Sequence, residues 1–407
     1  MDTEKSLSPS AEVDILEPTE TRRMRVNVGP SHPAMHGVIQ IVVEVEGETI
    51  VYSDTNFGYL HRGFEKECEN HTYQLCIPYT DRLNYVSPLI NNEGFCLAVE
   101  KFFGVDVPER CKYIRTMLSE LSRISDHQTC IGAAAMELGA FTPFLYLMKG
   151  RELIYRILEE VTGHRLTINY MRPGGLAADL PEGFFEHLRD ILPVIREVTS
   201  ETDKLLTKNR IFIDRTRNVG AISKEDALSF SYSGPCLRAC GMAYDVRKAF
   251  PYSAYDRVDF EVPVGSTGDT LDRYLVRMAE MEQSVRIIEQ CMRQIPDGPV
   301  SVNDPRVILP PKREVYHTIE GLVNHFKLVY EGIRPPKGEV YQMVEGGNGE
   351  LGYYIVSDGT GRPYRVRVRP PCFMIVSSMD FMIKGAMMAD IVPVFGSLNM
   401  IAGEMER

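Results

Sequence analysis

Two histidines stand four residues apart in Gly29-Pro-Ser-His-Pro-Ala-Met-His-Gly37, among prolines and glycines. Proline lacks an amide hydrogen and disfavours helix before it, and glycine accepts a positive φ, so the segment predicts a loop. Histidine titrates at about pH 6.5 and can donate a proton to a substrate that gains electrons. Such a loop can aim His36 into a cavity. From the loop alone, a hairpin entry whose histidines bond nearby carbonyls is an equal alternative.

Two further segments contain side chains suited to proton chemistry. Gly58-Tyr-Leu-His-Arg-Gly63 is a glycine-bracketed loop with a His-Arg pair, and Asp81-Arg-Leu-Asn-Tyr85 combines an acid, an arginine and a tyrosine. Tyrosine, with a pKa of about 10, can hold a carbonyl oxygen by a hydrogen bond and lend it a proton. Spacing alone leaves these roles open among several residues.

Other kinds of site lack the side chains they need. The nine cysteines include no Cys-x-x-Cys pair, the closest two being Cys236 and Cys240, and His32 and His36 have no third ligand nearby. We therefore expect no metal or iron–sulfur cluster bound by this chain. Neither a phosphate-binding loop nor a Gly-x-Ser-x-Gly elbow occurs.

The composition is that of a globular chain with an acidic balance. The net charge of −11 argues against nucleic acid as the main partner, because phosphate neutralisation needs a basic surface. The scattered cysteines are expected to be reduced, buried thiols in a cytosol-like compartment.

The apolar pattern predicts the elements that position these loops. Alternation over 39–52 predicts an antiparallel hairpin directly after the His loop. Three stripes at helical spacing, beginning at Ile114, Phe184 and Leu271, predict long helices with buried faces, and Gly163 is placed to end a fourth helix. Three short strands at 340–344, 353–356 and 364–368 predict a meander, whose last strand has a solvated or edge-protecting row of arginines, Arg365, Arg367 and Arg369.

The fold class expected from this pattern is α+β, mainly helical, with small antiparallel β regions near both ends. We expect a mobile tail over 1–22, a hairpin and loops over 23–90, a long-helix bundle over 91–335, and a meander with a C-terminal segment over 336–407. The apolar stretch from Cys372 to Gly396 contains Asp380, Lys384 and Asp390, which would be costly in hydrocarbon. It is expected to be a packed segment or a surface against a partner.

The order of the motifs along the chain points to one family. The chain resembles the NuoD-type quinone-site subunit of respiratory complex I, the NADH:quinone oxidoreductase, from about Val26 to Arg407. The resemblance rests on the three segments above and on Phe64-Glu-Lys66, Gly139-Ala-Phe-Thr-Pro143, Arg172-Pro-Gly-Gly175, Asn209-Arg210, Val262-Pro-Val-Gly-Ser266, Ser357-Asp-Gly359, Arg362-Pro-Tyr364 and Gly403-Glu-Met-Glu-Arg407.

The resemblance implies a fold similar to the large subunit of nickel–iron hydrogenases, with the metal cavity given over to quinone as substrate. Electrons would come from an iron–sulfur cluster in the adjacent subunit. The implied partners are that cluster-bearing small subunit, a NuoC-type subunit, a ferredoxin-like subunit and membrane-arm subunits at the quinone entrance. The implied location is the cytoplasmic side of a bacterial inner membrane, as a peripheral part of a proton-translocating complex. A mitochondrial matrix side is disfavoured by the acidic N-terminus.

Site residues follow from the resemblance position by position. His36 resembles the histidine that meets the quinone headgroup, Tyr85 the tyrosine at the other carbonyl, and Arg82 the pocket arginine. Arg62, with His61 beside it, resembles the arginine next to the terminal cluster.

Two positions depart from the family pattern. The partner of the catalytic histidine is usually an aspartate, where this chain has Glu137, one methylene longer. Thr167 stands where many members have a histidine near the cluster. Two alternatives stay open: a hydrogenase-type large subunit that binds its own metal, and a non-catalytic scaffold in a related membrane complex.

Overall fold

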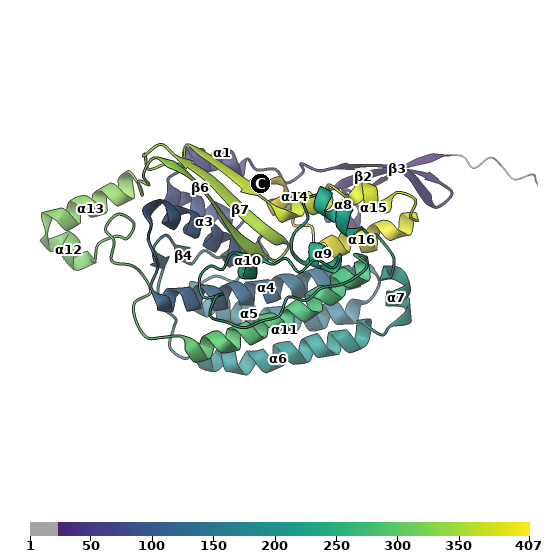
Figure 1. The fold of residues 1–407 in the computed structure, drawn as a ribbon, viewed down its shortest axis with the longest axis horizontal. Coiled ribbons are helices and arrows are strands. Elements are labelled where there is room, and N and C mark those ends of the chain that lie inside the picture. Colours follow the sequence, from purple (N-terminus) through teal and green to yellow (C-terminus); the bar gives the residue numbers. More distant parts are fainter. Residues whose placement is uncertain (1–22) are drawn as a thin grey trace, which may run out of the picture.

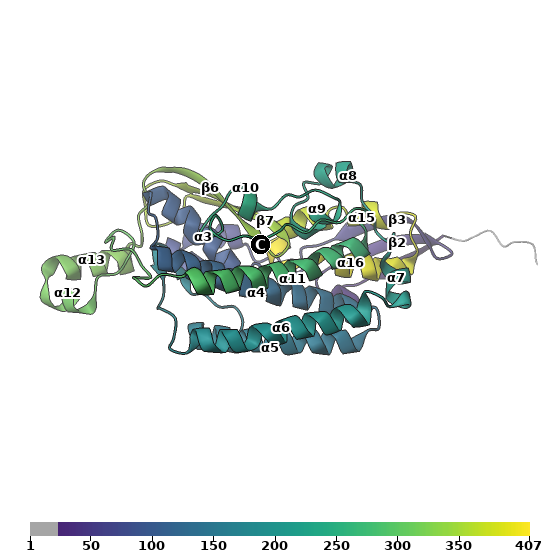
Figure 2. The same cartoon turned by 60° about the horizontal axis from the view of Figure 1, so that its bottom comes forward.

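The computed structural model describes residues 23–407, so the mobile tail predicted for 1–22 lies outside the described residues. These residues are mainly helical and form three small antiparallel sheets, which confirms the α+β class. Figure 1 shows a layer of long helices. Above this layer lie two sheets, one at each end, and shorter helices pack beside each sheet. Figure 2 shows α5 and α6 outermost, with α4 and α11 between them and the sheets.

The first sheet supports the His loop. Its strands β1 (Met24–Val28), β2 (Gln40–Glu46) and β3 (Thr49–Asn56) pair antiparallel in sequence order. The β2–β3 hairpin confirms the prediction, whereas β1 was not predicted. Val28 pairs with Ile41, so residues 29–39 form the connection between two neighbouring strands and are held at both ends.

The predicted long helices are confirmed and form the bundle. They are α4 (Glu109–Glu137), α6 (Phe184–Leu206) and α11 (Thr270–Gln294), together with α5 (Phe141–Thr162), which ends at Gly163 as expected. Gly163 caps α5 with a φ of 79°, a left-handed conformation that glycine adopts without strain. The apolar stripe that begins at Leu271 also includes Leu275, and this predicted core position is wrong because Leu275 is exposed.

Helix α4 is buried on nearly all sides, and it brings charged side chains into the core. Glu120 pairs with both Arg123 and Arg247, and Arg238 joins Glu280 to Glu345, all of them buried. Removing ions from water is costly unless they are paired, so the Glu120–Arg247 pair fixes how α4 meets its neighbour, and the Arg238 pairs join the segments packed around α4.

The meander is confirmed as β6 (Gly338–Gly346), β7 (Gly349–Ser357) and β8 (Arg365–Arg369). Its edge strand β8 packs against α1 (Phe64–Asn70). Arg365 and Arg367 therefore meet acids of the same chain, Glu69 and Glu65, at N–O distances of 3.0 and 2.5 Å. Of the two predicted states of this row, solvated or edge-protecting, the structure thus agrees with the second, because the arginines form ion pairs that cover the sheet edge.

The segment from Cys372 to Gly396 is packed, which agrees with the first of its two predicted states. It forms α14 (Pro371–Val376), α15 (Met379–Ile383) and most of α16 (Ile391–Leu398), and α17 (Ala402–Glu406) follows near the C-terminus. Most of their apolar side chains are buried. Within residues 23–407, no helix is both long and apolar enough to cross a bilayer.

All nine cysteines are buried and free, which confirms their predicted state.

The remaining elements connect these layers. The connecting elements are α2 (Tyr73–Thr80), α3 (Pro88–Phe103), β4 (Met171–Arg172), β5 (Gly175–Leu176), α7 (Arg210–Thr216), α8 (Lys224–Ser229), α9 (Gly234–Ala239), α10 (Val246–Ala249), α12 (Lys312–His317) and α13 (Ile319–Tyr330).

Candidate functional site

A cavity of about 220 Å³ lies where the His loop meets α4 and α16. Three of the residues predicted from the sequence, His36, Tyr85 and Glu137, line it together. They come from the β1–β2 connection, the loop before α3 and the C-terminal end of α4. The other lining residues are mostly apolar or small: Val38, Val86, Thr129, Cys130, Ala133, Phe395, Gly396, Asn399, Met400 and Ile401.

His36 reaches the cavity because the loop around it is anchored. The neighbouring Met35 is fully buried beneath the first sheet, and His36 itself has a left-handed backbone with a φ of 54°. Gly29, at the other end of the loop, has a φ of 85°, and any Cβ there would overlap the Ile39 carbonyl. The loop therefore holds the imidazole at the cavity rim, with 49% of its side chain exposed.

His36 and Glu137 form a direct hydrogen bond. The imidazole Nε2 donates to Glu137 Oε1 at 2.7 Å, and the glutamate side chain is only 7% exposed. This hydrogen bond raises the pKa of His36, although burial of the ring acts against it. Within residues 23–407 the other carboxylate oxygen, Oε2, is buried and has no hydrogen-bond partner. The pair thus presents a proton on the histidine and a free acceptor on the glutamate.

Tyr85, which lines the same cavity, is less exposed than His36. Burial raises the pKa of its phenol, and the positive charge of Arg62 opposes that rise. A phenol held in its neutral form can donate a hydrogen bond to a ligand carbonyl.

Arg62 and His61 are held by the C-terminal helix α17. The Arg62 guanidinium donates to the backbone carbonyls of Arg82 and Gly403, at 3.0 and 2.8 Å. His61 Nδ1 donates to the carbonyl of Glu406 at 2.7 Å, and the Glu406 carboxylate accepts from the amides of Gly58 and Leu60. The loop 58–62 is therefore fixed in position by α17.

Arg82 is the one predicted pocket residue that lies outside the cavity lining. Its guanidinium donates to Asp81 Oδ1 at 2.8 Å and to the carbonyl of Pro78 at 2.6 Å. The structure thus places His36, Tyr85 and Glu137 in one cavity, and His61 and Arg62 in loop 58–62. Arg82 instead forms hydrogen bonds at the C-terminal end of α2, next to its own position in the chain.

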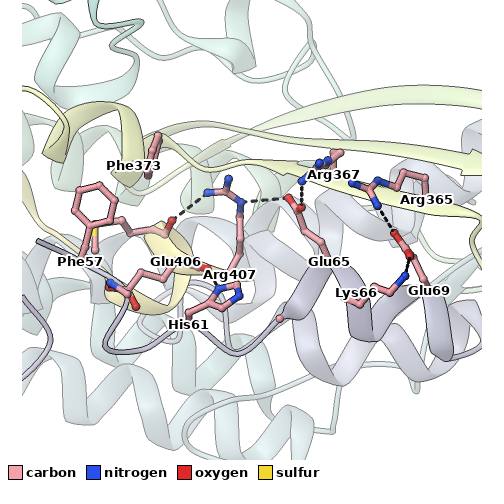
Figure 3. Close-up of a pocket in the computed structure, with 13 residues that line it drawn as sticks. Phe57, His61, Glu65, Lys66, Glu69, Arg365, Arg367, Phe373, Glu406 and Arg407 are labelled. Carbon is pink, nitrogen blue, oxygen red and sulfur yellow. Dashed lines mark hydrogen bonds and ion pairs between the residues drawn. The ribbon is translucent and has the colours of Figure 1, made fainter.

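A larger hollow, of about 420 Å³, lies on the other side of loop 58–62. Figure 3 shows its polar walls: Glu65 between Arg367 and Arg407, and Glu69 between Arg365 and Lys66. Each of these six side chains has an oppositely charged partner within the chain, and the Glu406 carboxylate, which also lines the hollow, accepts from the amides of Gly58 and Leu60. His61 is the only predicted site residue among those that line it, so the smaller cavity is the better candidate for chemistry.

The pattern of the sequence did not reveal the cavity wall formed by α16 and the residues after it. Phe395, Asn399 and Ile401 lie more than 250 residues beyond Glu137 in the chain. Asn399 had a local signal, because an asparagine after an apolar helix is suited to the left-handed φ of 54° that it adopts. Within the described chain, no three His, Cys, Asp or Glu side chains are grouped to hold a metal ion.

Comparisons with known proteins agree with the motif order. The family described as "Respiratory-chain NADH dehydrogenase, 49 Kd subunit" matches residues 137–407. The D 1 subunit of the NADH-quinone oxidoreductase of Sorangium cellulosum is 55% identical over 398 residues, which cover 98% of both chains. The corresponding D subunit of Myxococcus xanthus is 53% identical over 95% of this chain and 94% of its own. The C/D subunit of Bdellovibrio bacteriovorus is 50% identical over 98% of this chain and 71% of its own length.

Proposed function

The chain belongs to the family of the respiratory-chain NADH dehydrogenase 49 Kd subunit, and on that premise we propose that it forms the quinone-reduction site of a proton-translocating NADH-quinone oxidoreductase. The observation that carries the proposal is the meeting of His36, Glu137 and Tyr85 at one cavity. Reduction of a quinone to a quinol takes two electrons and two protons. The cavity offers two proton donors at neutral pH.

In the proposed reaction, His36 and Tyr85 hydrogen-bond the two quinone carbonyl oxygens and give them one proton each. Glu137 orients the imidazole and keeps it protonated through the 2.7 Å hydrogen bond. Its unpartnered Oε2 accepts a proton on the way back to His36. The apolar lining suits the faces of a quinone ring, and a cavity of about 220 Å³ fits a ring rather than a whole lipid quinone. The isoprenoid tail would therefore extend through the mouth of the cavity.

Electrons would reach the quinone from an iron–sulfur cluster of a neighbouring small subunit, beside Arg62 and His61. A fixed arginine near a cluster stabilises its reduced form, and loop 58–62 is fixed by α17. Thr167 in place of the frequent histidine would leave proton-coupled tuning of that cluster absent here. The bundle would share the architecture of nickel–iron hydrogenase large subunits.

We propose the other complex I subunits as partners, at the cytoplasmic face of a bacterial inner membrane. A NuoC-type subunit has specific support, since the Bdellovibrio relative is named as a joined C/D subunit. The ferredoxin-like and membrane-arm subunits remain implied by the family alone.

The test is Tyr85→Phe, assayed in membranes for NADH:quinone and for NADH:ferricyanide reductase activity, since ferricyanide accepts electrons upstream. We expect quinone reduction to fall by about 100-fold, as for loss of a general acid, with ferricyanide reduction retained. Tyr79→Phe is the matched control, because Tyr79 stacks on His71 on the surface of α2. A native gel establishes that each complex is assembled. Unchanged quinone reduction in an assembled Tyr85→Phe complex would favour the scaffold alternative.

A further inference from the structure

Two buried acids lie beneath the proposed quinone cavity, and the proposed mechanism uses neither. Asp126 of α4 is fully buried and accepts three hydrogen bonds, from Asn84 Nδ2 at 2.9 Å, Ser87 Oγ at 2.7 Å and Asn399 Nδ2 at 2.7 Å. All three donors are neutral. Asn399 also lines the cavity, so a single side chain links the cavity wall to this carboxylate.

Glu404 of α17 is the second acid, and it is 2% exposed. Its Oε1 accepts from the amide of Cys372 at 3.1 Å, and the Asn84 side chain lies next to it. Asn84 therefore touches both acids. Burial, together with the negative charge of Asp126, raises the pKa of Glu404 to about 7.

We propose that Asp126 and Glu404 form a proton-binding site beneath the cavity, in which Asp126 keeps the negative charge and Glu404 takes up and releases the proton. The geometry supports this division of roles. Asp126 accepts hydrogen bonds from three side-chain donors, which stabilise its ionised form, whereas Glu404 accepts from the backbone amide of Cys372. Two neighbouring buried carboxylates are costly to ionise together.

The charge on Glu404 should affect proton transfer to a bound quinone. Measuring that effect by quinone reduction rests on the proposed function. The Tyr85 phenol lies within electrostatic reach of Asp126, and Asn84 is its neighbour in the chain. Negative charge arriving on a bound quinone favours uptake of a solvent proton by Glu404, and departure of the neutral quinol favours its release. Conversely, an ionised Glu404 adds negative charge behind Tyr85 and makes the phenol hold its proton more tightly.

Other titratable groups surround the pair and belong to its environment. Cys372 on α14 and Tyr353 on β7 face Glu404. The groups within electrostatic reach of Asp126 are His127 and Cys130 on α4, Tyr155 on α5 and Tyr85. Arg62 is the cation that faces Tyr85. Burial raises the pKa of the Cys372 and Cys130 thiols and of the Tyr353 and Tyr155 phenols, so they stay neutral across the range in which Glu404 titrates.

The first experiment compares pH profiles of quinone reduction in assembled parent and Glu404→Gln complexes, with ferricyanide reduction recorded alongside. Glutamine keeps the shape and stays neutral, so we expect the alkaline decline to move up by about one pH unit. Glu93→Gln is the matched control: Glu93 is also fully buried, and it is hydrogen-bonded by Ser119 and Ser253 away from the cavity. Superimposable Glu404→Gln and parent profiles would overturn the proposal.

The second experiment does not depend on turnover. Infrared difference spectra of the parent complex, reduced minus oxidised, should contain a carboxylic acid C=O band that Glu404→Gln lacks. In Asp126→Asn the same band should titrate at lower pH, because the neighbouring charge is gone. A band that persists in Glu404→Gln would refute the assignment. If instead Tyr85→Phe reduces quinone normally while the Glu404 band is present, the proposed quinone site fails and the proton-binding site stands.

Discussion

The hydrogen bond between His36 and Glu137 joins a half-exposed imidazole to a buried carboxylate. A solvated histidine would lose its proton near pH 6.5, which would leave few donors at physiological pH. Glu137 raises that pKa, and the longer glutamate side chain reaches the imidazole Nε2 at 2.7 Å. The extra methylene compared with the usual aspartate is therefore compatible with pairing.

Replacing Glu137 with glutamine should lower the pKa of His36, because the acceptor loses its charge. Since the folded pKa is raised by the pair, the protonated donor should disappear at lower pH in the variant, and the alkaline limb of quinone reduction should move down by about one unit. The pH profile of the assembled complex measures this. The shift is opposite in sign to that expected for Glu404→Gln, so the two sites are distinguishable.

Glu137→Asp serves as the control for that prediction. It keeps the charge, so its profile should stay close to that of the parent even if its overall rate falls. If Glu137→Gln left the alkaline limb in place, the pair would not set the protonation of the donor.

At the residue scale, the sequence identified the groups with recognisable chemistry and missed those that act through position. His36, Tyr85 and Glu137 are reactive types in recognisable motifs, and they meet. Asp126 lies in a mostly polar stretch of α4, Ser125-Asp-His-Gln-Thr129, and nothing local marks it as buried with three neutral donors from two other segments. Long-range placement, rather than residue type, defines its role.

At the scale of elements, the β6–β7 turn approaches α4 at the proton-binding site. Gly347, in this turn, lies so close to Asp126 that a Cβ at position 347 would overlap the carboxylate. The same turn places Asn348, whose Oδ1 accepts from Asn399 Nδ2 at 2.7 Å. The β6–β7 turn thus packs against Asp126 and Asn399 beneath the cavity.

Gly347→Ala should therefore destabilise the chain by about 1–3 kcal/mol, the usual cost of forcing a methyl group into a packed site. Thermal unfolding of the purified full chain measures the change. Gly132→Ala in α4 is the control, because the atom nearest to the added methyl would be Phe144 Cδ2 at 3.3 Å, the edge of a side chain. Equal stability of the two variants would mean that the turn can retreat from α4.

The pattern of the sequence predicted the existence of the elements better than their surroundings. Periodicity located the hairpin, the meander and the long helices, because each must bury one regular face. It treated α4 as a helix with one apolar stripe, whereas Glu120, Arg123 and His127 of this helix are also buried. A charged residue in a sequence predicts an exposed side chain. Its burial costs free energy that is offset only by ion pairs with residues far away in the chain.

At the scale of the whole molecule, the helical pair α12–α13 projects from the end of the bundle opposite the first sheet (Figures 1 and 2). Helix α13 exposes a row of large apolar side chains there: Ile319, Leu322, Val323, Phe326, Val329 and Tyr330. Water-soluble monomers rarely expose a contiguous apolar surface of this kind. The isolated chain should therefore self-associate through it.

The double variant Phe326→Ser/Val329→Ser should reduce self-association of the purified full chain, measured by sedimentation velocity over a range of concentrations. Both side chains are mostly exposed, at 63% and 64%, so the free energy of unfolding should change by no more than about 0.5 kcal/mol each. Ile211→Ser is the control, because Ile211 is 72% exposed on α7, away from this row. If the control reduced association as much as the double variant did, general surface hydrophobicity rather than the α13 row would be responsible. If only the double variant reduces association, the free protein associates through the α13 row, at the end of the bundle opposite the first sheet and its His loop.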